Sequence, residues 1–173
     1  MNMALTHDED KPWKTDLARK SAQRRELVLA EIEQSIRSAP GFEDALRQAA
    51  ELMKKRFGRF SAVTVYVADG EDLVVHVALD RPHGPERVGS AGGPLADAAH
   101  GQTPTIVSDL SHSESWAGVG LNKGSVMVAP IRTDAGLWAI VEVWSDFRDA
   151  FSPPDVRLIE RVAAALARKT PTA

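Results

Sequence analysis

Residues 125–145 decide the fold, and they read SVMVAPIRTDAGLWAIVEVWS. Within them, two apolar runs at 126–131 and 137–144 flank the turn sequence DAG, a pattern that predicts a β-hairpin. A second hairpin is predicted upstream, where valine-rich runs at 60–68 and 73–79 flank the sequence DGED. Because tight turns join antiparallel strands, the two hairpins together predict a mostly antiparallel sheet.

Helical periodicity surrounds the hairpins. Good helix formers and apolar residues spaced three to four apart predict helices over 15–38 and 42–57. Near the C-terminus, Ser152 and Asp155 match the pattern of a helix N-terminus, and an apolar stripe follows them. The chain is therefore expected to form an α+β domain whose N- and C-terminal helices cover one face of the sheet.

The region between the hairpins is predicted to be mostly loop. Residues 80–93 are rich in Pro, Gly and charge, and 109–122 form another polar connection. A short helix at 95–100 and a short strand at 105–107 are expected between them. These loops and short helices are expected to form a pocket over the face of the sheet that the terminal helices leave open.

Composition limits the classes of function. Of the 173 residues, 43% are hydrophobic and 26% are charged, which is typical of a globular domain. We expect a disordered leader at 1–14, the helix 15–38, one domain over 40–169 and a tail at 170–173.

The formal net charge of -3 gives no support to nucleic-acid or membrane-surface binding. The sequence has neither a bilayer-spanning apolar run nor the pattern of a signal peptide, so a cytoplasmic location is expected.

Cysteine is absent from the sequence. Its absence excludes disulfides, thiolate metal sites, iron–sulfur clusters, cysteine nucleophiles and thioether-linked chromophores. The Ser, His and Asp residues within 108–115 lack the motif of a catalytic triad, and no metal set or acid–base pair stands out elsewhere. We therefore expect a binding protein rather than an enzyme.

Five segments in a fixed order carry a family resemblance. They are GFEDALRQAAELMKKRFG (41–58), SAVTVYVAD (61–69), GGPLADAAHGQTPTIVSDLS (92–111), the hairpin 125–145 and FSPPDVRLIERVAAALA (151–167). Over residues 40–169 the chain resembles the GAF domain family. The resemblance implies a GAF/PAS-like fold, with a six-stranded antiparallel sheet, terminal helices on one face and a small-molecule pocket on the other.

The same resemblance suggests which kinds of ligand to consider. Members of the family bind cyclic nucleotides, haem, bilins, small anions or metabolites, and some only dimerise. Free methionine sulfoxide reductase is similar in fold, but its chemistry needs cysteines, and bilin attachment needs one too. The acidic strand motif of that reductase, Asp-x-Asp, is matched here only by the residues Glu142-Val143-Trp144. Neither activity is expected of this chain.

Candidate ligand residues follow from the alternation of side chains along a strand. Alternation through the last predicted strand places four side chains on one face, which we assign to the pocket: Trp138, Ile140, Glu142 and Trp144. The full predicted set of ligand-binding residues is Tyr66, His76, Trp116, Met127, Trp138, Glu142 and Trp144.

Glu142 has two interpretations, because a carboxylate is costly to bury without a partner. In the first, it forms an ion pair with Arg81 or Arg87 and the tryptophans only cover the sheet. In the second, it binds a ligand that carries an ammonium or ring N–H group, and the tryptophans add cation–π contacts.

Two further sites are weaker. Backbone N–H groups near Gly92 and Gly93, at the entry to the short helix, are suited to a small anion, and the alternative is a flexible helix entry. Histidines would suit haem as an alternative cofactor, but their spacing forms no ligand motif, so no cofactor or metal is expected. They are His76, His83, His100 and His112.

Two hypotheses of function remain open. The first is a stand-alone sensor, in which a small molecule enters between the sheet and the loops, orders residues 80–93 and signals through a helical dimer face. The second is a ligand-free scaffold for dimerisation or for a signalling partner such as a kinase or a phosphodiesterase. The apolar stripe of helix 15–38 exceeds what the domain needs, so we expect a homodimer through this helix and the C-terminal helix.

Overall fold

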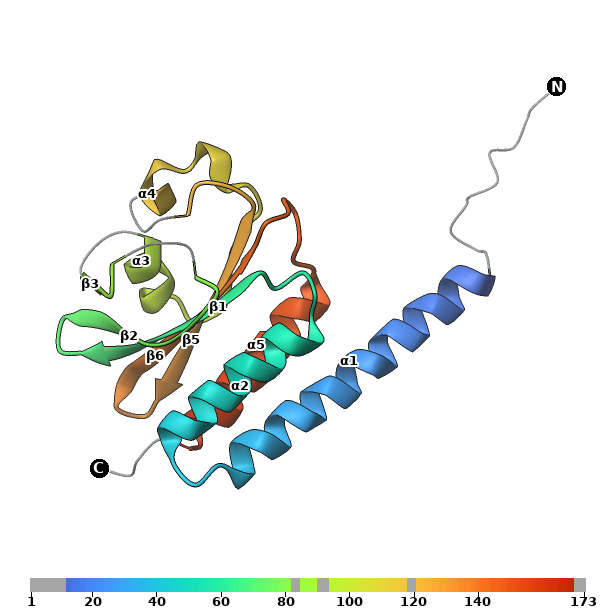
Figure 1. Ribbon diagram of the computed structural model, residues 1–173, viewed down its shortest axis with the longest axis horizontal. Helices are drawn as coiled ribbons and strands as arrows, with labels where there is room; N and C mark the ends of the chain where they lie inside the picture. Colours follow the sequence, from blue (N-terminus) through green and yellow to red (C-terminus); the bar gives the residue numbers. More distant parts are fainter. Residues whose placement is uncertain (1–11, 82–84, 90–93, 118–120, 170–173) are drawn as a thin grey trace.

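The computed structural model of the chain describes residues 12–81, 85–89, 94–117 and 121–169. Within these residues the helices are α1 (Pro12–Ser38), α2 (Phe42–Arg56), α3 (Pro94–His100), the 3-10 helix η2 (Leu110–His112), α4 (Glu114–Ala117) and α5 (Pro153–Ala167). The strands are β1 (Ala62–Asp69), β2 (Asp72–Leu79), β3 (Arg87–Gly89), β4 (Thr105–Val107), β5 (Ser125–Thr133) and β6 (Gly136–Ser145). Figure 1 shows one twisted sheet with helices on both of its sides.

The described strands form a six-stranded antiparallel sheet in the order β3-β2-β1-β6-β5-β4. The two predicted hairpins, β1–β2 and β5–β6, are joined edge to edge by pairing of β1 with β6. Strand β3 was not predicted, because its three residues lie in a Pro- and Gly-rich connection and give no alternating pattern. The predicted α+β fold class is confirmed.

Two helices cover one face of the sheet, and a third helix lies outside them. α2 packs on β1 and β2, α5 packs on β5, and α1 packs against α2 and α5 (Figure 1). Helix α1 therefore lies on other helices and not on the sheet, where the simplest interpretation of its sequence had placed it. This face carries the larger core, whose fully buried side chains include Ile32, Ile36, Leu46, Met53, Val63, Val141, Ile159 and Val162.

The opposite face carries a second, smaller core. Leu95 of α3, Leu110 of η2 and Trp116 of α4 pack over apolar side chains of the strands. Loops and short helices thus cover this face, as the sequence predicted. Long helices cover one face of the sheet, and short helices with their connecting loops cover the other. The ligand site was predicted on the face that the short helices and loops cover.

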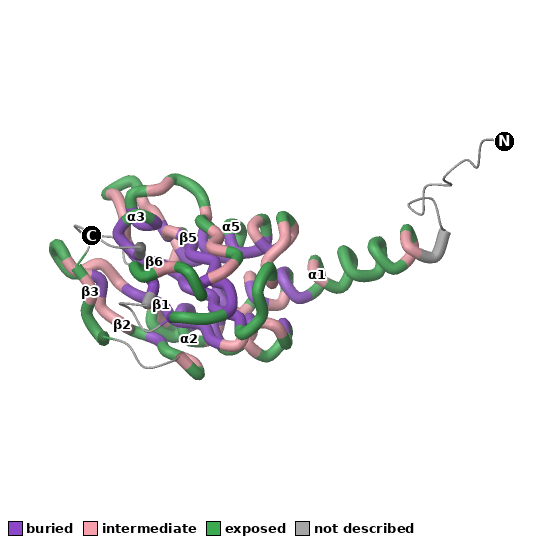
Figure 2. The backbone as a smooth tube through the Cα atoms, turned by 90° about the horizontal axis from the view of Figure 1, so that it is seen from above, coloured by how far each residue is buried: buried purple, intermediate pink, exposed green. Residues whose placement is uncertain are grey.

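Helix α1 extends beyond the rest of the domain, as Figure 2 shows. It begins at Pro12, three residues before the predicted start, and its first buried side chain is Val28. The part of α1 before Val28 is largely exposed, including Leu17 at 58% and Leu27 at 68% exposure. Residues 1–11 of the predicted leader and the tail 170–173 lie outside the described residues.

Asp155 joins three elements at the start of α5. Its carboxylate accepts hydrogen bonds from the backbone N–H and the hydroxyl of Ser152, at 2.8 and 2.6 Å, which is the predicted cap of the helix. The same carboxylate forms ion pairs with Arg59, which follows α2, and with Arg25 of α1. Asp155 is completely buried, so these partners compensate a charge that water does not reach.

None of the helices in the described residues combines the length and the apolar character that crossing a membrane requires.

Candidate functional site

Two β-bulges change which face of the sheet the predicted ligand residues occupy. In β2, Val75 and Val77 pair with Tyr66 and Val65, so His76 is an extra residue between them. In β6, Trp138 is the extra residue in the same way, between Leu137 and Ala139. Simple alternation is interrupted at each bulge, so the predicted faces of the two bulge residues, His76 and Trp138, are wrong.

Trp138 lies on the helix-covered face and not in the predicted pocket. It packs against the larger core, and its ring makes an edge-on contact with Phe42 of α2, with 3.7 Å between the ring centroids. His76 is exposed at its bulge, while Val75 before it and Val77 after it belong to opposite cores. Because of the bulges, Trp138 and His76 do not lie with the other predicted ligand residues.

Met127 also lies on the helix-covered face. Its partner across the hairpin is Val143, and residues directly opposite each other in an antiparallel pair share a face. Both side chains are buried in the larger core. The prediction is wrong because the pairing of β5 with β6, and no pattern within β5 itself, decides which face Met127 occupies.

The remaining four predicted residues lie together on the loop-covered face. Tyr66, Trp116 and Trp144 belong to the smaller core, and the Tyr66 hydroxyl lies 3.4 Å from Oε2 of Glu142. The indole N–H of Trp144 donates a hydrogen bond of 2.9 Å to the carbonyl oxygen of Lys123, which fixes the ring in its plane. The structure therefore assembles a polar group, Glu142, among aromatic side chains.

Glu142 lies near the centre of the sheet. Its strand, β6, is paired on both sides, with Thr64 of β1 and Val128 of β5 as its direct neighbours. Only 2% of the residue is exposed. Thr64 was not among the predicted residues, because only the pairing of β1 with β6, which are distant in sequence, places it beside this carboxylate. The Thr64 hydroxyl completes no hydrogen bond among the described residues.

Arg81 supplies the positive charge nearest to Glu142. Asp80 precedes it with φ of 52°, a left-handed conformation that aspartate tolerates, and this conformation turns the chain at the end of β2. The Arg81 guanidinium carbon then lies 5.4 Å from the centre of the Tyr66 ring. One of its nitrogens, Nη1, donates to the carbonyl oxygen of Pro85, whereas Nη2 is buried without a hydrogen-bond partner among the described residues.

Arg87, the other predicted partner of Glu142, is engaged elsewhere. It forms ion pairs with Asp69 and Asp72 at the tip of the β1–β2 hairpin. Within the described part of the chain, Glu142 forms no ion pair shorter than 4.0 Å, although the charge of Arg81 acts on it. The buried carboxylate is therefore only partly compensated.

Burial raises the pKa of Glu142 from 4.5 to about 7, although the Arg81 charge and the Tyr66 hydroxyl act in the opposite direction. Burial and the nearby Glu142 charge likewise raise the pKa of Tyr66, which stays protonated. Glu142 is therefore close to the midpoint of its titration at neutral pH. In its charged form it can accept hydrogen bonds from a cation, and in its neutral form it can also donate one.

The weaker predicted sites receive less support from the described residues. His100 and His112 are exposed, as is His76, and His83 lies outside the described residues. No group of three His, Asp or Glu side chains suited to a metal ion occurs in the described ranges. Gly92 and Gly93 of the predicted anion site lie outside them as well.

A family model for the GAF domain matches residues 39–168. The chain belongs to the GAF domain family. The match covers the sheet, α2 and α5, and it leaves out all of α1. This GAF domain is accordingly the part of the chain that contains Glu142 and the surrounding aromatic side chains.

Solved structures share the GAF fold at low sequence identity. The free methionine-R-sulfoxide reductase of Neisseria meningitidis, in complex with its substrate, is 20% identical, with a TM-score of 0.77 over 86% of this chain and 89% of that chain. A candidate GAF sensor protein of Burkholderia vietnamiensis is 19% identical, with a TM-score of 0.77 over 86% and 94%. The GAF domain of a phosphoenolpyruvate-protein phosphotransferase of Coxiella burnetii is 16% identical, with a TM-score of 0.75 over 86% and 93%.

Sensor domains and reductases thus share this GAF fold, so the fold by itself does not choose between them. The comparison with curated proteins finds no match. Domains of the GAF family are commonly sensory or regulatory modules that bind small molecules, and the residues of this chain decide which chemistry is open to it.

Proposed function

We propose that this chain is a regulatory GAF module that binds a small molecule on the loop-covered face of its sheet, with Glu142 as the group that recognises it. The observation that carries this proposal is a buried carboxylate near the centre of the sheet that has no close ion-pair partner among the described residues. A ligand with an ammonium or ring N–H group would supply the missing partner.

The side chains around Glu142 offer both apolar and polar contacts to a ligand. Aromatic side chains provide apolar walls, and Arg81 offers an unpartnered donor, Nη2, for an anionic group of the same ligand. A molecule with both an ammonium and a carboxylate group, such as a free amino acid, fits this pair of charges. Since the chain has no cysteine, we propose binding without cysteine-dependent reduction.

A thermal-shift screen tests whether the site binds at all. Free methionine sulfoxide, other free amino acids, simple amines, nucleotides and nitrate form the probe set. Because a ligand that binds only the folded state stabilises it, at least one amine-bearing probe is expected to raise the melting temperature. Stabilisation by none of the amine-bearing probes would favour the ligand-free scaffold instead.

Replacing Glu142 with glutamine is expected to weaken binding of the amine-bearing probe at least about tenfold, because a charge-assisted hydrogen bond is lost. Calorimetric titration measures the affinity. Wild-type protein should also release protons on binding at pH 7, since a cation beside Glu142 lowers the pKa of that group. Glu51→Gln, the same change on the exposed surface of α2, is the matched control and should bind as wild type does.

We further propose that α1 pairs with α1 of a second copy to form a homodimer. Support comes from two exposed leucines of α1, Leu17 and Leu27, which the domain itself does not cover. Helix α5 packs against α1, so we include it in the proposed helical dimer face. A change in the loops could then reach a partner through the helix-covered side of the sheet.

Light scattering coupled to gel filtration is expected to give the mass of a dimer for the wild-type chain. Leu27→Lys should shift the equilibrium toward the monomer by at least about tenfold, because it places a charge in the apolar contact. Ala18→Lys, at an exposed position on the side of α1 away from Leu27, tests whether any added lysine has this effect. A wild-type chain that is monomeric at high concentration would rule out this dimer.

A further inference from the structure

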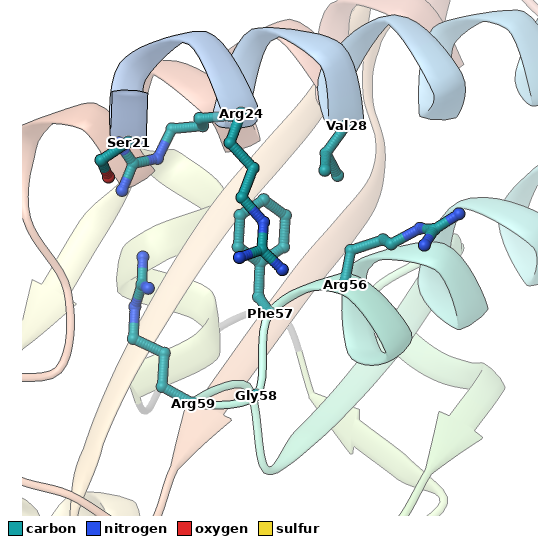
Figure 3. A pocket seen from close by; sticks show the side chains of 8 residues that line it. Ser21, Arg24, Val28, Arg56, Phe57, Gly58 and Arg59 are labelled. Carbon is teal, nitrogen blue, oxygen red and sulfur yellow. The ribbon is translucent and has the colours of Figure 1, made fainter. Parts of the chain in front are cut away.

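An arginine-rich cleft lies on the opposite side of the molecule from Glu142, where α1 meets the turn between α2 and β1. The cleft has a volume of about 270 Å³ and is lined by Ser21, Arg24, Arg25, Val28, Arg56, Phe57, Gly58 and Arg59. Figure 3 shows Arg24 reaching down from α1 in front of the Phe57 ring, and Arg59 reaching up from the turn toward Ser21. Guanidinium groups from two separate elements thus converge on one hollow.

The positive charge of the cleft is only partly neutralised. Arg25 and Arg59 share one carboxylate, that of Asp155, and Arg56 forms an ion pair of 2.6 Å with Glu31. Arg24 has no ion pair among the described residues and is exposed. Four guanidinium groups therefore face two carboxylates, which leaves an excess of two positive charges.

Two of the arginines that line the cleft each have a hydrogen-bond donor without a partner. The Nε atoms of Arg25 and Arg59 are buried, and neither has a hydrogen-bond partner among the described residues. A buried N–H group without an acceptor destabilises the protein, so such donors favour a ligand that brings acceptor oxygens. Planar guanidinium groups match the oxygens of a phosphate group in both spacing and charge.

We propose that this cleft binds the phosphate group of a small phosphorylated metabolite, independently of the Glu142 site. Arg24 contacts the phosphate as the uncommitted cation, and the Nε–H groups of Arg25 and Arg59 donate to its oxygens. The apolar side chains of Val28 and Phe57 form the floor, which suits the carbon skeleton of the ligand. The volume accommodates a sugar phosphate and is below the usual size of a site for a larger molecule.

Calorimetric titration of the full chain with inorganic phosphate, pyrophosphate, ribose 5-phosphate and ribose tests this proposal at constant ionic strength. The probes that carry phosphate are expected to bind, and ribose is not. Arg24→Gln should weaken their binding at least about tenfold, because it removes a charge-assisted contact while leaving the ion pairs of Asp155 in place. Arg47→Gln, the same loss of charge at an exposed position of α2, should change the affinity less than twofold.

Nuclear magnetic resonance spectroscopy shows where the phosphate group binds. In the folded wild-type chain, the Nε–H resonances of Arg25 and Arg59 are expected to shift on addition of pyrophosphate, while that of Arg47 stays in place. The proposal is overturned if millimolar phosphate probes do not bind, if the two glutamine variants lose affinity equally, or if the shifts appear at Arg47 instead. Glu142→Gln should leave phosphate binding unchanged, so this test and that of the first site fail separately.

Discussion

Asp155→Ala is expected to lower the free energy of unfolding by about 3–5 kcal/mol, a large part of the stability of a domain of this size. The carboxylate is completely buried, and its removal leaves the guanidinium groups of Arg25 and Arg59 without their shared partner. It also removes the acceptor for Ser152 at the start of α5. Urea denaturation at neutral pH, with the midpoint and slope both fitted, measures the loss.

Ser152→Ala separates the cap of the helix from the ion pairs. It removes only the hydroxyl donor and should cost about 1 kcal/mol. A double-mutant cycle of Asp155→Ala with Arg59→Ala should then show a coupling energy well above that of an exposed pair. If Asp155→Ala lowers the free energy of unfolding no more than Ser152→Ala does, the ion pairs of Asp155 contribute little to stability, which contradicts this prediction.

Glu142 is expected to make the stability of the protein depend on pH, which is the second large effect. Its pKa is about 7 in the folded protein and near 4.5 in an unfolded chain. Between these values the folded state holds more protons than the unfolded state, so the free energy of unfolding falls as the pH rises. The stabilisation is complete below about pH 4.5 and is lost as the pH passes through 7; the difference between the pKa values corresponds to about 3 kcal/mol.

Glu142→Gln removes this titration and keeps the shape of the side chain. The difference in unfolding free energy between wild type and variant should therefore change by about 3 kcal/mol between acidic and mildly alkaline pH, in favour of the variant at the alkaline end. Urea denaturation at a series of pH values gives the two curves. Parallel curves would mean that Glu142 is not buried in the way described, and Glu51→Gln supplies the curve expected of an exposed glutamate.

The sequence predicted the elements whose pattern is local. Both hairpins, the long helices and the cap formed by Ser152 and Asp155 are present, because periodicity and turn residues act within a few positions of each other. Strand β3 escaped prediction, since three residues are too few to show a period. The α+β class followed from the order of elements alone.

The candidate site was predicted only in part, and one physical cause explains most of the misses. Alternation along a strand is interrupted at a bulge, and whether a bulge forms depends on the partner strand. His76 and Trp138 both occupy bulges, while Glu142 and Trp144 lie beyond the bulge in β6, where alternation holds again. Which face of the sheet each of these residues occupies depends on pairing between strands that are distant in the sequence. No short stretch of sequence can therefore predict it.

The arginine cleft shows the same limit more strongly. Its lining residues lie within 21–28 and 56–59, and the carboxylate that pairs with two of its arginines is at position 155. Each arginine looks like an ordinary surface residue of a helix or a turn in the sequence. Only the packing of α1 on α2 and α5 brings them to one place.

The outer position of α1 makes it a lever. It rests on two helices, and its contacts with the rest of the domain reach back to about Ser21, which lines the arginine cleft. The nine residue steps from Ser21 to Pro12 span about 14 Å of helix. A rotation of about 10° around Ser21 would displace the far end by about 2 Å, which a helix lying flat on the sheet could not do. Small adjustments in the body are thereby enlarged at the tip, where a neighbouring molecule would sense them.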